Sequence, residues 1–249
     1  MNARPEGFMP EAPRGAPVAA PVQITEVFHS VQGEGAHVGL PTTFVRLTGC
    51  SLRCAWCDTQ YSFYGGEASD VDRVMDEVRK FLPVKRVCVT GGEPMDQPDA
   101  CVALMERLLA EDYDVVLETS GGVPVDRAAA LAPRERLILS LDVKCPASNM
   151  QKRNVWSNLA LLRPHDQLKF VIADERDYQY MLDTLAKHPV PCRVLLQPMW
   201  DIPNPMGLKL AGAPWDLRTL AERVVADRLD VRVGTQLHKH IWGPQRKGV

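Results

Sequence analysis

Short apolar segments alternate with helical segments along this chain, and the alternation limits the possible folds more than any other feature of the sequence. Segments that are apolar on both faces and are joined by helices are typical of a parallel sheet built from βα units. We expect six strands and a weaker seventh, over residues 42–47, 86–90, 114–119, 137–143, 168–173, 193–198 and 231–234. We expect helices after a cap at Ser69, from about Pro98, from Asp126, over 175–187 and over 214–229.

Six or seven βα units are fewer than the eight of a closed barrel. We therefore predict an α/β fold, an incomplete TIM-type barrel of about six parallel β/α units, with a doubly wound sheet as the alternative. In a barrel of this kind the active site lies at the carboxyl ends of the strands. Polar side chains follow nearly every predicted strand, so we expect a site at that edge.

The N-terminal segment has a different composition from the rest of the chain. Residues 1–21 contain five of the 20 prolines, with Ala and Gly between them and almost no large apolar residue. Such a segment cannot bury enough surface to offset the entropy that ordering costs. We predict a flexible arm over residues 1–21 and a single domain over 22–249.

The charge of the chain is nearly balanced, with 29 Lys and Arg residues against 31 Asp and Glu residues. This balance argues against a nucleic-acid partner and against binding to an anionic membrane. No apolar run reaches the ~18 residues that a membrane span needs, and the first residues lack the apolar core of a signal peptide. We expect a cytoplasmic protein with its seven cysteines reduced.

Three of the seven cysteines lie close together in the segment CSLRCAWC, at Cys50, Cys54 and Cys57. Three thiolates at this spacing can bind three irons of a [4Fe–4S] cluster and leave the fourth iron open to a small molecule. A structural zinc site is the alternative, and it would need His29 or His37 to fold back as a fourth ligand. The spacing favours the cluster.

The segment TGGEP, residues 90–94, follows the next predicted strand. Two adjacent glycines allow a ligand to approach the backbone closely. The cysteine spacing followed by this segment resembles the radical S-adenosylmethionine (SAM) superfamily. The resemblance implies that Gly91, Gly92 and Glu93 hold the methionyl end of SAM, and that Trp56 lies near the cluster or the adenine, unless it only packs in the core.

Longer motifs narrow the resemblance. FHSVQGEG (28–35), VGLPTTFVRLTGC (38–50), CAWCDT (54–59), SLDVKCP (140–146) and QLHKHIWG (236–243) are together similar to the 7-carboxy-7-deazaguanine synthase family, over about residues 24–244. The resemblance implies a carbon–nitrogen lyase of 7-deazapurine biosynthesis, the pathway that also leads to queuosine. Its substrate would be 6-carboxy-5,6,7,8-tetrahydropterin, with loss of ammonia, and its cofactors a [4Fe–4S] cluster, SAM and Mg²⁺.

The same resemblance implies roles for individual residues. Glu34 would accept from the N–H groups of the pterin ring, Arg46 would pair with the substrate carboxylate, and Thr59 would be a hydroxyl ligand of Mg²⁺. The expected substrate contacts are Val31, Gln32, Gly33, Glu34, Arg46, Thr90, His238 and Pro244. The expected SAM contacts are Trp56, Gly91, Gly92, Glu93, Asp142, Val143, Lys144, Gln197, Pro198 and Met199.

Each role has a structural alternative. Arg46 can be an ordinary ion-paired strand residue, Thr59 a helix cap, His238 a surface side chain, and Asp142 with Lys144 a simple ion pair. The run 174–178, DERDY, is expected to be a solvated helix start.

Two other functions share part of the pattern: an enzyme that activates a glycyl-radical partner, and a non-catalytic iron–sulfur protein. The QGEG segment and Arg46 favour a small carboxylated substrate. The resemblance also implies an electron donor such as flavodoxin or ferredoxin, and a homodimer.

Overall fold

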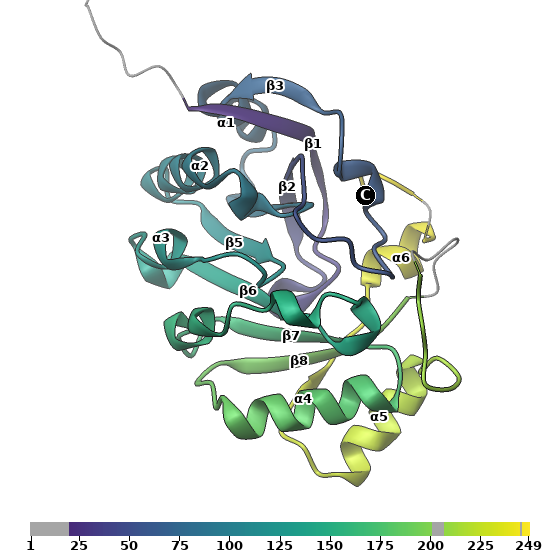
Figure 1. Cartoon of the computed structure of the whole chain (residues 1–249). Coiled ribbons are helices and arrows are strands. Elements are labelled where there is room, and N and C mark those ends of the chain that lie inside the picture. The colour runs from purple at the N-terminus through teal and green to yellow at the C-terminus, as the bar shows by residue number, and fades with distance from the viewer. Residues whose placement is uncertain (1–19, 201–206, 245) are drawn as a thin grey trace, which may run out of the picture.

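The computed structural model describes residues 20–200, 207–244 and 246–249. Its sheet has nine strands in the order β3-β1-β2-β4-β5-β6-β7-β8-β9 (Figure 1). From β2 to β9 every neighbouring pair is parallel, whereas β1 is antiparallel to both β2 and β3. The strands are β1 Pro21–Val31, β2 Pro41–Leu47, β3 Glu67–Asp70, β4 Arg86–Gly91, β5 Asp114–Thr119, β6 Leu137–Val143, β7 Gln167–Ile172, β8 Arg193–Pro198 and β9 Arg232–Val233.

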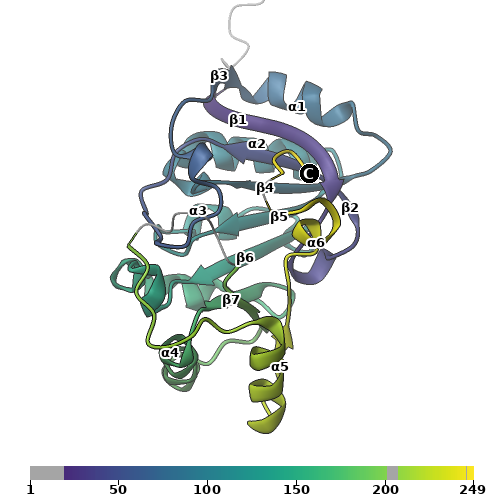
Figure 2. The ribbon, with the colours of Figure 1, turned by 90° about the vertical axis from the view of Figure 1, so that its right-hand side faces the viewer.

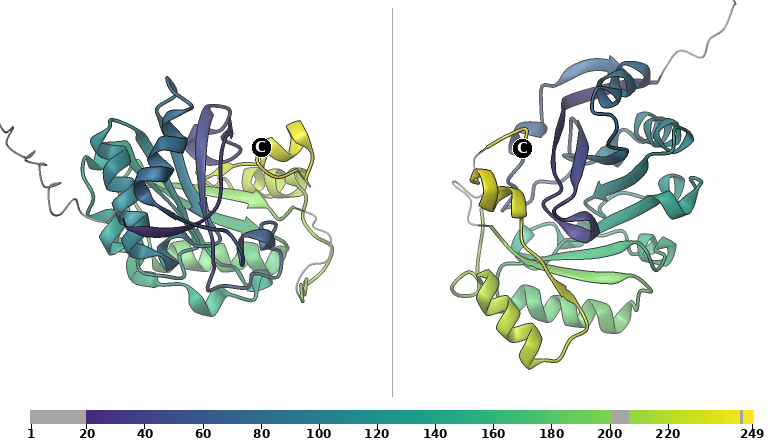
Figure 3. Two further views of the ribbon diagram at one scale, coloured as in Figure 1. Left: turned by 90° about the horizontal axis from the view of Figure 1, so that it is seen from above. Right: turned by 180° about the vertical axis from the view of Figure 1, so that it is seen from behind.

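The helices follow the strands, as the alternation in the sequence predicts. They are α1 Val71–Arg79, α2 Pro98–Ala110, α3 Asp126–Ala129, α4 Glu175–Lys187, α5 Leu217–Ala226 and α6 Leu237–Trp242. Seen from behind, α1 to α4 lie on one side of the curved, open sheet and α6 lies on the other (Figure 3). The predicted α/β fold, an incomplete barrel of parallel units, is confirmed.

The antiparallel part of the sheet was not predicted. β1 buries Val22 and Ile24 and leaves Gln23 between them exposed. This alternation is typical of an antiparallel strand with one face toward solvent, whereas the predicted parallel strands are continuous apolar runs. Pro21 pairs with Asp70 of β3. The predicted arm over residues 1–21 is therefore too long at its end, and residues 1–19 lie outside the described part of the chain.

Two helix boundaries also differ from expectation. Asp70, not Ser69, caps α1, because the Asp70 carboxylate accepts a hydrogen bond from the backbone N–H of Arg73 at 2.9 Å. The helix expected over 214–229 is shorter, and Asp216 caps it by accepting from the N–H of Thr219 at 2.7 Å.

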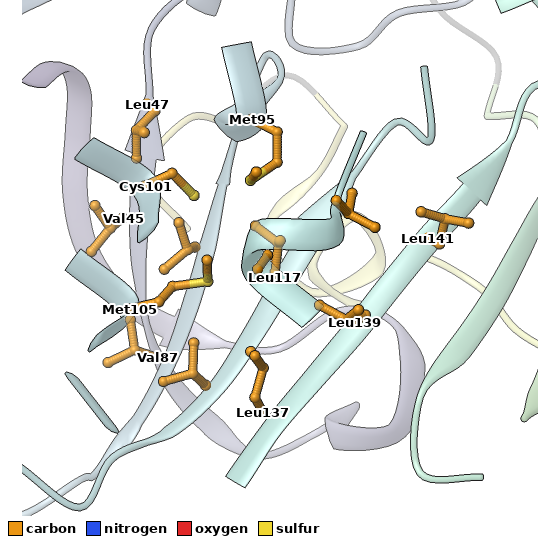
Figure 4. Close-up of a cluster of buried hydrophobic side chains, with 14 of the residues drawn as sticks. Val45, Leu47, Val87, Met95, Cys101, Met105, Leu117, Leu137, Leu139 and Leu141 are labelled. Carbon is orange, nitrogen blue, oxygen red and sulfur yellow. The ribbon is translucent and has the colours of Figure 1, made fainter. Parts of the chain in front are cut away.

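The main core lies between the sheet and the outer helices (Figure 4). Val87 and Leu117 on the strands and Met105 on α2 are fully or almost fully enclosed. Burial of each such side chain contributes about 1.5–3 kcal/mol to stability. This core fixes the strands and so fixes the positions of the polar side chains at their ends.

The described residues contain no helix with the length and apolar character needed to cross a membrane.

Candidate active site

A polar pocket of about 180 Å³ opens where the carboxyl ends of the parallel strands meet α6 and the C-terminal residues. Figure 2 shows α6 and the C-terminus in front of the sheet. Strand pairing places Arg46 beside Thr90 and Asp142 beside Lys169. The pocket is lined by Val31, Gln32, Glu34, Phe44, Arg46, Asp58, Thr59, Thr90, Gly91, Glu118, Lys169, Gln197, Gln236, His238 and Val249.

The three clustered cysteines lie in the loop that follows β2, beside this pocket. None of them is in a disulfide, and Cys54 is buried while Cys50 and Cys57 are half-buried. Burial raises the pKa of the Cys50 thiol to about 11 and raises the pKa values of the other two thiols above their usual range. A metal group that binds here must therefore displace the thiol protons.

Among the residues that the structure describes, no three His, Cys, Asp or Glu side chains are placed to hold a single metal ion. The fit of the three thiols to an iron–sulfur cluster rests on the loop itself. The N–H of Ala55 donates to Ser148 O at 3.0 Å and the N–H of Glu93 donates to Gly49 O at 2.8 Å, so the loop is fixed before Cys50 and between Cys54 and Cys57 to the segments that follow β4 and β6.

The two glycines of the GGEP segment lie against the backbone that leads into the cysteine loop. A Cβ on Gly91 would lie 2.3 Å from Leu47 O, and a Cβ on Gly92 would lie 2.2 Å from Gly49 O. The side of each glycine on which a Cβ would stand is thus filled by backbone carbonyl oxygens. The glycines therefore allow β4 to pack against that loop.

Glu93 is completely buried, and other groups of the chain already bind its carboxylate. It accepts hydrogen bonds from the backbone N–H groups of Met95 at 2.9 Å and Ser120 at 2.7 Å, and from the hydroxyls of Thr119 and Ser120. Burial raises the pKa of Glu93, against the effect of these donors. The Glu93 side chain thus supports the end of β4, and only its backbone remains for contact with a cofactor.

The residues expected around SAM form two groups. Lys144 donates to Asp142 at 2.7 Å, so the predicted ion pair is present, and the Lys144 ammonium also lies 5.3 Å from the centre of the Trp56 ring. Val143 is in the main core, with its side chain away from the pocket. Gln197 lines the polar pocket, whereas Pro198 and Met199 line a neighbouring apolar cavity of about 360 Å³.

Trp56 packs against the small apolar cluster that contains Met199. Its indole Nε1 is buried and has no hydrogen-bond partner among the described residues. A buried donor without a partner is costly unless a ligand or water satisfies it. The aromatic ring and the orphaned N–H together fit a heteroaromatic ligand between the cysteine loop and Met199.

Arg46 projects into the pocket from β2 and is only partly engaged by the protein. Its Nε donates to Glu26 at 2.7 Å, and its guanidinium lies 5.9 Å and 5.8 Å from the ring centres of Phe28 and Tyr61. Burial opposes the charge of Arg46, but Tyr61 and Glu26 raise its pKa above the ordinary value. A permanently charged guanidinium at a polar pocket suits an anionic ligand.

Thr59 occupies the position that would cap the 3₁₀ turn Gln60–Ser62, but its side chain makes no capping hydrogen bond. The hydroxyl lies 3.7 Å from the Cys57 sulfur and lines the pocket. The capping alternative is therefore wrong, and the hydroxyl is positioned for a ligand.

The QGEG segment supplies two pocket residues that bind other parts of the site. Gln32 donates to Glu118 at 3.3 Å, and Thr90 donates to the second oxygen of Glu118 at 3.2 Å. Glu34 accepts from Lys169 at 2.9 Å and from Gln236 at 2.8 Å. Burial opposes the charge of Glu34, but Lys169 lowers its pKa below the ordinary range.

The C-terminal segment closes one side of the pocket, and His238 is part of that wall rather than a surface residue. The N–H of Leu237 donates to Gly33 O at 3.0 Å, and a Cβ on Gly33 would lie 1.9 Å from His238 Nδ1. Burial lowers the pKa of His238, so its imidazole is neutral near pH 7. Pro244 does not line the same pocket; it borders an adjoining one of about 120 Å³ that shares Arg46 and Thr59.

Six residues that line the pocket were not among the expected substrate, SAM or metal contacts: the polar Asp58, Glu118, Lys169 and Gln236, and the apolar Phe44 and Val249. Lys169 had a usable signal, since it is a charged residue inside the apolar segment 168–173. A buried strand carries a lysine only where acidic groups surround it. Gln236 donates to Asp58 at 3.2 Å, and Lys239 donates to both side chains, but no sequence pattern connects these distant segments.

Comparison with known proteins agrees with the motifs. Residues 44–160 match the model of the radical SAM superfamily. A 7-carboxy-7-deazaguanine synthase from Koribacter versatilis is 42% identical over 231 residues, which cover 92% of this chain and 100% of that protein. The chain belongs to the 7-carboxy-7-deazaguanine synthase family. A member from Thermoplasma acidophilum is 36% identical over 88% of this chain and 97% of its own length.

The fold is also that of a solved structure. The crystal structure of QueE from Escherichia coli superimposes with a TM-score of 0.65 at 23% identity, and the match covers 88% of this chain and 95% of that one. The radical SAM match implies a [4Fe–4S] cluster and SAM as cofactors. The cysteine loop and the Trp56 surroundings fit these two groups.

Proposed function

We propose that this chain is a radical SAM lyase that converts 6-carboxy-5,6,7,8-tetrahydropterin to 7-carboxy-7-deazaguanine and ammonia. The observation that carries the proposal is the polar pocket beside the cysteine loop, which is lined by the Arg46 guanidinium, the Thr59 hydroxyl and the carboxylates of Glu34, Asp58 and Glu118. The product is the substrate less ammonia, so the net reaction is redox-neutral.

Cys50, Cys54 and Cys57 would hold the cluster. Trp56, the backbone of Gly91, Gly92 and Glu93, and the residues Asp142, Val143, Lys144, Gln197, Pro198 and Met199 are proposed to surround SAM. When bound, the cluster and SAM would together supply the one-electron radical chemistry that removal of hydrogen from C6 of the substrate requires.

The residues of this chain would bind and orient the substrate. The guanidinium edge of Arg46 that Glu26 leaves open would pair with the substrate carboxylate. Glu34, in the QGEG segment, would accept from the N–H groups of the pyrimidinone edge, with Val31, Gln32 and Gly33 beside it. Thr90 and the neutral His238 would contact the ring, and Pro244 would border the mouth.

Thr59 is proposed as the protein ligand of Mg²⁺. Its hydroxyl lies at the same pocket wall as Arg46, where the substrate carboxylate would supply further oxygens. Mg²⁺ favours oxygen ligands and often completes its coordination with substrate and water. In this position the ion would orient the carboxylate and stabilise negative charge during ring contraction.

We also propose a cytoplasmic homodimer that receives electrons from a flavodoxin or ferredoxin. The open sheet supports the dimer, because its two edges, β3 and β9, carry backbone groups without a neighbouring strand among the described residues, and a partner can cover them. An activating enzyme for a glycyl-radical protein would need a groove for a polypeptide, whereas here α6 and the C-terminal residues enclose a pocket of small-molecule size.

Anaerobic turnover tests the proposal. Cluster-loaded enzyme, SAM, Mg²⁺, a chemical reductant and 6-carboxy-5,6,7,8-tetrahydropterin should give 7-carboxy-7-deazaguanine, identified by mass, with one equivalent of ammonia. The control is the Cys57→Ala variant, which should give no product. SAM cleavage without consumption of the pterin would contradict the proposed substrate.

A further inference from the structure

Lys169 lines the pocket, although it was not among the residues expected at the site. It lies on β7 and its side chain is 12% exposed. Its ammonium donates to Glu34 at 2.9 Å and lies 3.2 Å from Asp142 Oδ1. Glu34 follows β1, whereas Asp142 is on β6, so one ammonium joins two segments far apart in the sequence.

The two carboxylates that Lys169 joins are held by other partners at their far ends. Glu34 accepts from Gln236 through its other oxygen at 2.8 Å, and Asp142 accepts from Lys144 through its other oxygen at 2.7 Å. The chain of contacts therefore runs from the segment before α6 to the side chain that lies over Trp56. Lys169 is the central link of that chain.

The charges around Lys169 disfavour proton transfer as its role. Burial opposes the charge of its ammonium, but Asp142, Glu34 and Glu118 raise its pKa well above the ordinary value. An ammonium held charged in this way is a poor proton donor at neutral pH. Its contribution is electrostatic and geometric.

We propose that Lys169 is a positioning residue that couples the substrate half of the pocket to the SAM half. The inference rests on the proposed function, in which Glu34 contacts the pterin and Asp142 lies at the SAM subsite. A ligand that fixes either carboxylate also fixes the shared ammonium, and with it the other carboxylate. The second ligand then binds to side chains that the first ligand has already ordered, so its binding loses less conformational entropy. Each ligand should therefore tighten the binding of the other by the same factor.

The test is equilibrium binding of SAM to cluster-loaded enzyme, without reductant so that no turnover occurs, at a fixed saturating Mg²⁺ concentration. The dissociation constant is measured with and without 6-carboxy-5,6,7,8-tetrahydropterin. For the wild type we expect the pterin to tighten SAM binding by about fivefold or more. In Lys169→Met the factor should fall to about twofold or less, and Lys169→Arg, which keeps the charge and two or more donors, should retain most of it.

Two further variants separate coupling from damage to the fold. Asp142→Asn keeps Lys169 paired with Glu34 and weakens only the link to the SAM side, so it should also lower the factor. Lys239→Met is the control: Lys239 is another buried lysine of the site, but it donates to Asp58 and Gln236 and to neither Glu34 nor Asp142, so the factor should persist. Cluster absorbance and far-ultraviolet circular dichroism report folding for each.

The outcomes distinguish the two claims. If the wild type binds the pterin but the pterin does not alter SAM affinity, the coupling role is wrong while the proposed function stands. The same conclusion follows if Lys169→Met and Asp142→Asn keep the wild-type factor, or if Lys239→Met loses it as well. If the wild type does not bind the pterin at all, the proposed substrate is wrong.

Discussion

Cys50, Cys54 and Cys57 differ from the other cysteines of the chain in position as well as spacing. Cys88, Cys101, Cys145 and Cys192 are buried singly, whereas these three share the loop at the end of β2. We predict that Ala at any one of the three prevents stable cluster assembly and abolishes SAM cleavage. Iron content and SAM cleavage after anaerobic reconstitution check this, with Cys192→Ala as the control that keeps both. Full iron content in a loop variant would contradict the ligand assignment.

The Thr59 hydroxyl makes no capping hydrogen bond to the turn that follows it. Substitutions of Thr59 can therefore test Mg²⁺ binding without removing a helix cap. Substrate affinity should rise with Mg²⁺ in the wild type, because two ligands that bind each other favour each other's binding. Thr59→Ala should weaken this dependence, and Thr59→Ser, which keeps the oxygen, should be much milder. The measurement is the pterin KM as a function of Mg²⁺ concentration in chelator-treated enzyme. Equal behaviour of Ala and Ser would rule out Thr59 as a ligand.

For single residues, the sequence predicted many of the side chains that line the pocket. It was less informative about the groups that those side chains contact. Arg46 and His238 were expected at the pocket and lie there. Glu93 was expected to face a ligand, but four donors of the chain enclose it, and a motif does not reveal how many donors surround a carboxylate. Lys169 was missed because its acidic partners come from two other segments.

At the scale of elements, the contact between the QGEG loop and α6 depends on a glycine. A methyl group at Gly33 would overlap the His238 imidazole and displace the wall of the pocket. Misplacement of a binding group by about 1 Å can cost up to ~100-fold in rate. We predict that Gly33→Ala lowers kcat/KM for the pterin by about tenfold or more while the cluster spectrum is unchanged.

The matched control for this variant is Gly234→Ala, where a Cβ meets no atom within 4 Å. It should keep the wild-type kcat/KM. If Gly33→Ala also keeps it, α6 does not form the wall of the functional pocket.

The start of α4 is only partly solvated, which corrects the expectation for DERDY: Glu175 and Arg176 are exposed, whereas Asp174, Asp177 and Tyr178 are buried. Asp177 is completely enclosed and accepts from the N–H groups of Ala147 at 2.9 Å and Ala173 at 3.0 Å. Burial raises the pKa of Asp177 to about 6, above the ordinary 3.8. The folded state therefore holds this proton more tightly than the unfolded state does.

A raised carboxyl pKa gives stability that is present below pH 3.8 and is lost as the pH rises through about 6. The loss approaches about 3 kcal/mol. Urea unfolding of the apoprotein from pH 4 to 7 should show it, and Asp177→Asn, although less stable overall, should lack this component. The stability difference between wild type and variant should thus shrink as the pH rises. A constant or growing difference would contradict the pKa direction.

The predictability of the elements follows their burial. The strands from β4 to β8 are largely buried on both faces. Because they are mostly apolar along their length, the sequence predicts their bounds to within about one residue. β3 is half exposed and only four residues long, and α6 has six, too few for a clear periodicity. Such short elements form because of their tertiary contacts, so no local pattern predicts them.

At the scale of the whole molecule, the open sheet brings the cysteine loop after β2, the strand ends and the C-terminal segment to one pocket. The parallel alternation predicted this convergence at the carboxyl edge. It did not predict the depth of the pocket, because the enclosing wall comes from α6 and from residues up to Val249. The central claim of the account is that this pocket holds the pterin with its C6 directed at the SAM subsite.

Transfer of deuterium from substrate to cofactor tests that claim most directly. Cluster-loaded enzyme is given reductant, Mg²⁺, unlabelled SAM and pterin deuterated at C6. The account predicts deuterium at the 5′ carbon of the recovered 5′-deoxyadenosine or SAM, together with 7-carboxy-7-deazaguanine. Formation of that product with no deuterium in either nucleoside, or cleavage of SAM with the labelled pterin recovered unchanged, would contradict it.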